Sequence, residues 1–169
     1  MQKLICVFIV YFAIGFAADR KGEITYGRVF KGKPIPGVTI KSSKDKSVIT
    51  WNELVNATNN PLRATIYIKY TSRNKSDMAN IQNLCGTYET SSFKHRAQLF
   101  ILKTIANVKT CPIEKGTKIT LISKHYTYLY STVDNDLCGP FRMEVKVFRK
   151  NDKLIPIILG YFQGNITGC

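Results

Sequence analysis

The chain has 169 residues, and its 25 lysines and arginines outnumber its 11 aspartates and glutamates to give a net charge of +14 at pH 7. That charge favours anionic partners, namely nucleic acid, heparan-like glycans, anionic lipid headgroups or acidic proteins. The basic residues are spread out, however, so most of the charge is expected on solvated surface. The sequence has no internal repeat and no low-complexity linker, which excludes repeat architectures and indicates one domain.

The first 18 residues have the pattern of a secretory signal peptide. Lys3 precedes the apolar run LICVFIVYF, and small residues follow up to Ala18. The run is shorter than the roughly 20 residues that a bilayer crossing needs. We therefore expect cleavage after Ala17 or Ala18 and a single exported domain over residues 19–169. Loss of Lys3 lowers the net charge to +13.

Strands are predicted throughout the first half of the exported domain. Residues 24–30, ITYGRVF, alternate in the way a half-buried strand does. A turn region around KGKPIPG follows, and residues 38–51 form two short extended pieces around a polar turn. Residues 62–71, LRATIYIKYT, give the clearest strand, because Ala64, Ile66 and Ile68 share one face.

The middle of the chain predicts one helix around residues 91–108. In SFKHRAQLFILKTIANV, apolar residues recur at spacings of three and four, which is the period of an amphipathic helix. Ser91 or Ser92 can cap its start. The pattern leaves open a strand from Gln98 to Ile105 as the alternative.

The last third returns to strand patterns. Residues 117–130 alternate, and residues 141–150 and 153–164 read as a hairpin with a tight turn at Asn151-Asp152. The apolar stretch 154–159 predicts burial on both faces, whereas Pro156 favours a sheet edge or a bulge. The expected fold is mostly β, an antiparallel β-sandwich with one helical segment.

No pattern in the chain predicts catalysis or a cofactor. His95 and His125 are the two histidines, and neither accompanies a nucleophile motif such as GxSxG. Phosphate-loop and dinucleotide-binding motifs are also missing. We therefore expect a protein that is not an enzyme and has no cofactor.

Cysteines and glycosylation sequons agree with export. Cys6 lies in the signal peptide, so two disulfides among the other four cysteines have three possible connectivities. These four are Cys85, Cys111, Cys138 and Cys169. No pair has the C-x₂₋₄-C spacing of a zinc site, so no metal is expected. Three N-x-[ST] sequons predict N-glycans on exposed loops, at Asn56, Asn74 and Asn165.

The segment CPIEKGT at 111–117 combines a cysteine, a glycine and charged residues, as catalytic or metal loops also do. Oxidised Cys111 has no thiolate to offer. Pro112 fixes a backbone angle, Gly116 permits a tight turn, and a strand pattern follows at once. We interpret the segment as the start of a strand.

A family resemblance rests on this segment and on GPFRMEVKVFRKNDKLIPIILGYFQG. Together they resemble the C-terminal half of the ML lipid-recognition superfamily, in its ganglioside-activator-like branch, which includes the insect CheB-type chemosensory proteins. The resemblance covers residues 85–164. One departure is that the family places a cysteine in the last strand, where this chain has LIPII, so the disulfide map cannot be copied. We expect Cys85–Cys111 and Cys138–Cys169.

The resemblance implies a β-sandwich whose apolar interior holds a lipid or another hydrophobic small molecule. Basic residues such as Lys118, Arg142 and Lys146 are then candidates for contact with an anionic headgroup or membrane surface at the cavity mouth. The candidate lining residues, each of which can equally be ordinary packed core, are Ile66, Ile68, Phe100, Ile101, Ile119, Leu121, Val145, Val147 and Ile157.

The leading hypothesis is therefore a secreted, non-enzymatic carrier or presenter of hydrophobic molecules, chemosensory if the source is an insect. Its partner is a lipid or similar ligand, with no nucleic acid. The alternative is a secreted basic module that binds an acidic protein or glycan and has a solid core. A secreted hydrolase that uses His95 or His125 is a third hypothesis.

Overall fold

The computed structural model describes residues 20–72, 74–125, 128–132, 138–152 and 154–168. The predicted signal peptide lies outside these ranges. Within them, no helix has both the length and the apolar character that a membrane crossing requires.

Strands make up 51% of the structure, which is an antiparallel β-sandwich with one α-helix, as the sequence predicts. The elements are β1 Arg20–Lys31, β2 Val38–Ser42, β3 Lys46–Trp51, β4 Leu62–Tyr70, β5 Lys75–Ile81, α1 Phe93–Ala106, β6 Lys118–Ile122, the 3₁₀ turn η1 Ser123–His125, β7 Tyr128–Thr132, β8 Gly139–Arg149 and β9 Ile158–Thr167.

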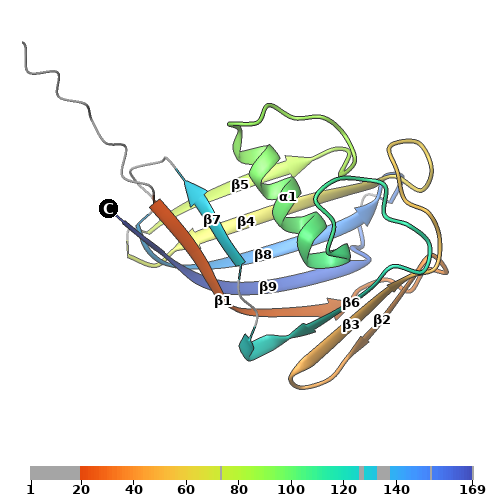
Figure 1. Cartoon of the computed structure of the whole chain (residues 1–169), viewed down its shortest axis with the longest axis horizontal. Helices are drawn as coiled ribbons and strands as arrows, with labels where there is room; N and C mark the ends of the chain where they lie inside the picture. The colour runs from red at the N-terminus through yellow and green to blue at the C-terminus, as the bar shows by residue number, and fades with distance from the viewer. Residues whose placement is uncertain (1–19, 73, 126–127, 133–137, 153, 169) are drawn as a thin grey trace, which may run out of the picture.

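The two layers of the sandwich differ in size. One is a six-stranded sheet in the order β5-β4-β8-β9-β1-β7, and the other is a three-stranded sheet in the order β2-β3-β6. The helix α1 completes the smaller layer: it lies over the β5 side of the large sheet, and the three-stranded sheet lies toward β1 (Figure 1). The apolar core is enclosed between these layers.

Alternation along the central strands explains which face is buried. In β4 and β8, the cross-strand pairs Ile66–Val145 and Ala64–Val147 are buried, whereas Tyr67 is exposed on the other face. Paired residues of an antiparallel ladder point to the same face, so register carries the apolar pattern from strand to strand. The inner face of the sheet is apolar and its outer face is mainly polar.

The helix begins and ends where its capping residues predict. Ser92 is the N-cap, and its Oγ accepts a hydrogen bond from the N–H of His95 at 3.1 Å. Asn107 ends the helix in the left-handed conformation, and its N–H bonds to the carbonyl of Lys103 at 3.0 Å. Asparagine adopts this conformation more readily than most residues. The segment that alternatively predicted a strand, Gln98 to Ile105, lies within this helix.

Three features of the β layout differ from the sequence-based expectations. The pattern over 117–130 is two strands, because η1 lets the chain cross from β6 in the small sheet to β7 in the large one. The stretch 154–157 is a connection rather than a strand, and Leu154 is exposed rather than buried. Strand β5, at the edge of the large sheet, was not predicted, because its sequence KSDMANI is mostly polar.

Candidate functional site

Buried hydrogen bonds hold the sandwich together: one joins the two parts of the smaller layer, and another joins that layer to the large sheet. The Trp51 Nε1–H of β3 donates to the carbonyl of Ile105 at 2.9 Å, which connects the small sheet to the end of α1. The Ser47 hydroxyl donates to the carbonyl of Val29 at 2.7 Å, which connects β3 to β1. Buried donors and acceptors are costly unless paired, so these bonds hold the layers in one arrangement.

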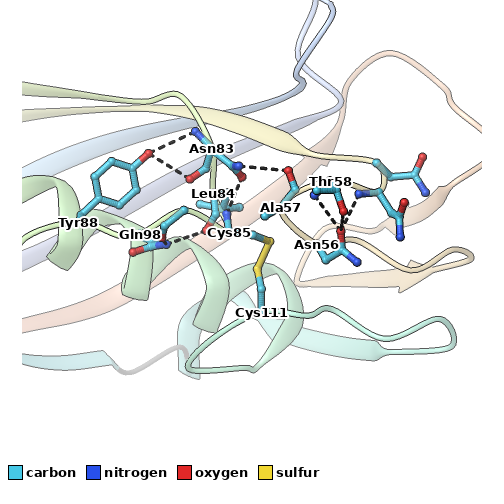
Figure 2. The surroundings of a disulfide bond; sticks show 12 residues. Asn56, Ala57, Thr58, Asn83, Leu84, Cys85, Tyr88, Gln98 and Cys111 are labelled. Atoms are coloured by element: carbon cyan, nitrogen blue, oxygen red, sulfur yellow. Dashed lines mark hydrogen bonds between the residues drawn. A yellow bond between two sulfur atoms is a disulfide. The ribbon is translucent and has the colours of Figure 1, made fainter.

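The expected Cys85–Cys111 disulfide is present (Figure 2). It links the segment before α1 to the segment after α1. It joins the loop after β5 to the segment before β6. Beside it, the amide of Gln98 on α1 donates to the carbonyls of Leu84 at 2.9 Å and Gly86 at 2.7 Å. The helix is therefore held both by side-chain hydrogen bonds and by a covalent link next to it.

The segment CPIEKGT is the start of a strand, as we interpreted it. Ile113 pairs with Val55 through two backbone hydrogen bonds, and the Gly116 N–H donates to the carbonyl of Trp51 at 2.7 Å. Gly116 has a φ of +90°, where a side chain is strained, and β6 begins two residues later. The segment serves the fold through its disulfide and its turn.

The second expected disulfide, Cys138–Cys169, includes Cys169, which lies outside the described residues. Cys138 itself is disulfide-bonded. The segment 133–137 that precedes it also lies outside the described ranges, so the connection between β7 and β8 plays no part in the site below.

The nine residues that the sequence predicted as cavity lining converge on the space between the layers. Eight of them are buried in one apolar cluster, and Ile119 packs against it half-buried. They come from the large sheet, the helix and β6, with Ile157 just before β9. The structure thus brings them together, and it adds inward-facing residues that were not singled out: Tyr70, Phe141, Met143 and Phe162.

Aromatic rings gather between α1 and the β9–β1 side of the large sheet. The Phe100 ring lies 5.0 Å from the Tyr128 ring and 5.0 Å from the Phe162 ring, in edge-to-face contacts in both cases. A second contact, between Tyr70 and Phe141, has a ring separation of 6.4 Å. We call Phe100, Tyr128 and Phe162 the aromatic cluster. Each edge-to-face pair contributes about 0.5–1.5 kcal/mol beyond area burial.

Glycines face inward beneath these rings. Inward positions of β1 and β9 are held by Gly22, Gly27, Gly160 and Gly164, whose ladder partners include buried residues. A Cβ at Gly160 would lie 2.7 Å from Cε2 of Phe162, and one at Gly164 would lie 2.2 Å from the backbone oxygen of Glu23 and 2.6 Å from Cζ of Phe141. The phenyl rings therefore lie against bare backbone, in space that a side chain at these positions would take.

The electrostatics of the described interior are nearly neutral. The buried polar residues are Ser47, Gln98, Thr104 and Ser123, none of which is charged. Burial raises the pKa of Tyr128, whose hydroxyl is therefore neutral at physiological pH. This environment suits an apolar ligand and gives no group that would favour an ionised one.

The basic residues that the sequence suggested for a cavity mouth lie on β6 and β8. Arg142 and Lys146 alternate with the buried residues of β8 and point to the outer face of the large sheet. There Lys146 pairs with Glu144, whose hydrogen bond raises the pKa of the lysine. Lys118, at the start of β6, is exposed and alternates with the core-packed Ile119. Alternation directs Arg142 and Lys146 away from the interior, and their contact with a headgroup or membrane surface stays a prediction.

Of the two histidines, only the side chain of His95 is described. His95 lies in the first turn of α1, half-buried, with its Nδ1 buried and without a hydrogen-bond partner. His125 ends η1, directly before residues that are not described. Nothing in the described geometry assigns either one a role.

The sequons occupy three different settings. The side-chain Oδ1 of Asn56, in the loop between β3 and β4, accepts hydrogen bonds from the Thr58 N–H at 2.9 Å and hydroxyl at 3.0 Å (Figure 2). Asn74 lies in the β4–β5 turn with a φ of +47°. Asn165 is exposed on β9 rather than on a loop, so the expectation of three loop sequons was wrong for it.

No protein-family model matches the chain, and no curated protein is significantly similar to it in sequence. The sequence GYFQG, at residues 160–164, alternates in the manner of a strand, and this pattern places Phe162 on the same face as Gly160 and Gly164. Tyr128 gave a weaker signal, because its strand is short and begins after a change of sheet.

Proposed function

We propose that this protein is a secreted, non-enzymatic carrier of a lipid or another hydrophobic small molecule, as the resemblance to the ML lipid-recognition superfamily implies. The observation that carries the proposal is that two inward rings lie against glycines of β9: Phe162, of the aromatic cluster, against Gly160, and Phe141 against Gly164. The bound molecule occupies the space between α1 and this part of the large sheet.

The arrangement supports ligand uptake because side chains alone can make room. Phe162 and Phe141 lie against Gly160 and Gly164, which have no Cβ, so we expect these rings to reorient more easily than rings packed against side chains. The layers themselves stay in place, since Trp51, Gln98 and the disulfide hold α1 at several points. An acyl chain or sterol in this space is stabilised by burial, at about 25 cal/mol per Å² of apolar surface removed from water.

The size difference between the layers also favours an interior ligand. Six strands on one side face only three strands and a helix on the other. An apolar space that combines aromatic and aliphatic walls with few polar groups is the usual setting for hydrophobic ligands. The described interior meets that requirement, because its buried polar residues are uncharged.

Native mass spectrometry of the protein secreted from eukaryotic cells, after glycan trimming, tests the proposal. We expect a stoichiometric adduct that organic extraction identifies as a lipid or similar molecule. A ligand-free mass, with no uptake of offered fatty acids, sterols or glycolipids, contradicts the proposal and favours the basic interaction module.

A matched pair of variants locates the ligand. Phe100→Ala removes one ring of the aromatic cluster and should change the identity or occupancy of the adduct. Leu62→Ala is the control, because Leu62 is equally buried but pairs with Arg149 at the opposite end of β4 from Tyr70. Both variants lose about 2–5 kcal/mol of stability, so an adduct altered equally in both contradicts the assigned location.

A further inference from the structure

The connection between β8 and β9 exposes two adjacent aliphatic side chains. Leu154 is 87% exposed and Ile155 is 52% exposed, and Leu154 is the most exposed large hydrophobic residue in the described ranges. Three residues after Leu154 the pattern reverses, since Ile157 and Ile158 are fully buried. We call Leu154 and Ile155 the apolar tip. It lies at the end of the sandwich where β8 meets β9 (Figure 1).

The apolar tip is held in this exposed position by specific contacts. The Asp152 backbone N–H donates to the carbonyl of Arg149 at 3.0 Å, which forms a turn just before the tip. The Asp152 carboxylate forms an ion pair of 2.7 Å with Lys33, and the Asp152 carbonyl accepts a bond from Arg63 at 2.9 Å. These contacts fix a turn that presents both side chains to solvent.

The segment after the tip is anchored as well. The carbonyls of Pro156 and Ile157 accept hydrogen bonds from the N–H groups of Lys33 and Gly32, at 2.8 and 3.0 Å. Residue 32 has to be glycine here, because a Cβ would collide with the backbone at Pro156. Residues 31–33 therefore pack closely against the β8–β9 connection and help to hold it in place.

Two lysines near the tip have no acidic partner among the described residues. Lys31 pairs in register with Ile158, and Lys150 lies just before the turn; both are exposed and have no carboxylate partner in the described residues. The carboxylates nearby are Asp152, paired with Lys33, and Glu53, paired with Arg149. The surface beside the two aliphatic side chains therefore has a net positive charge.

We propose that the apolar tip inserts into the headgroup region of an anionic lipid bilayer, with Lys31 and Lys150 contacting lipid phosphates. Two aliphatic side chains are far too little surface for a stable protein interface, which buries about 800 Å² per partner. They are enough for reversible binding to a bilayer when a basic patch adds electrostatic attraction. This membrane contact is independent of whether the interior carries a ligand.

Vesicle co-sedimentation of the secreted protein tests the inference. We expect binding to phosphatidylcholine vesicles that contain phosphatidylserine, and much weaker binding to pure phosphatidylcholine. The double variant Leu154→Ser, Ile155→Ser should bind the anionic vesicles about tenfold more weakly. Met78→Ser is the control, because Met78 is 62% exposed on β5, away from the tip, and should leave binding unchanged.

A fluorescence readout follows the tip directly. Leu154→Trp should shift its emission to shorter wavelength with anionic vesicles, whereas Met78→Trp should not. Trp51 is fully buried and gives a constant background. Three outcomes overturn the inference: no binding to anionic vesicles, equal binding to neutral ones, or undiminished binding by the double variant. Self-association that the double variant abolishes, without vesicle binding, also overturns it and assigns the tip to contact between copies.

Discussion

Replacing Trp51 with phenylalanine tests the contact that joins the two parts of the smaller layer. Trp51 is completely buried on β3, and its Nε1–H satisfies the carbonyl of Ile105 in the last turn of α1. The carbonyls in the last turn of a helix have no partner within the helix. The indole therefore acts as a C-terminal cap supplied by another element.

The expected loss of stability has two parts. Leaving the Ile105 carbonyl buried and unpaired costs about 1–3 kcal/mol. The smaller ring leaves a gap of roughly 40 Å³, which at about 24 cal/mol per Å³ adds about 1 kcal/mol. We therefore expect Trp51→Phe to lower the free energy of unfolding by about 2–4 kcal/mol, and the melting temperature by roughly 5–10 °C.

Urea unfolding followed by far-UV circular dichroism measures this change without relying on tryptophan fluorescence. The control is Ile49→Val, which removes one methylene from the same buried face of β3 and should cost about 1 kcal/mol. The urea dependence of stability should be the same in both variants. If Trp51→Phe costs no more than Ile49→Val, the hydrogen bond to Ile105 contributes nothing and the capping argument fails.

Three further changes have defined outcomes. Removing the disulfide with Cys85→Ala and Cys111→Ala should lower the free energy of unfolding by about 3–4 kcal/mol, because the disulfide closes a loop with a sequence separation of 26. Urea unfolding of the non-reduced protein measures this loss. Ser92→Ala should cost about 1 kcal/mol by removing the helix N-cap, read from the same curves against Ser91→Ala. The hydrogen bond from Lys33 lowers the pKa of Asp152, so this contact stabilises the fold above the unfolded pKa of about 3.9 and is lost as pH falls through the lower folded value. Asp152→Asn should flatten the stability–pH curve in that acidic range, and an unchanged curve would remove Asp152 from the account of the tip.

Local patterns in the sequence were sufficient for most of the elements. The alternation in LRATIYIKYT and FRMEVKVFRK specifies both the strands and their buried faces, because a strand has a side-chain period of two. The spacing of apolar residues by three and four after Ser92 specifies a helix, because residues three and four apart lie on the same face of a helix. These patterns are properties of single segments, so no partner is needed to read them.

Which strands pair with each other, and which apolar side chains stay exposed, was decided only by the tertiary structure. Nothing in TKITLISKHYTYLY says that its halves pair with different sheets, since alternation is the same whichever strand lies alongside. LIPII reads as a buried strand, yet Asp152 and Lys33, 119 residues apart in sequence, hold Leu154 and Ile155 in solvent. The sequence by itself determined most of the strands, the helix and most of the residues that face inward. The contacts between distant segments decided that rings lie over glycines inside the sandwich and that an apolar tip stands outside it, because both depend on which backbones approach each other in space.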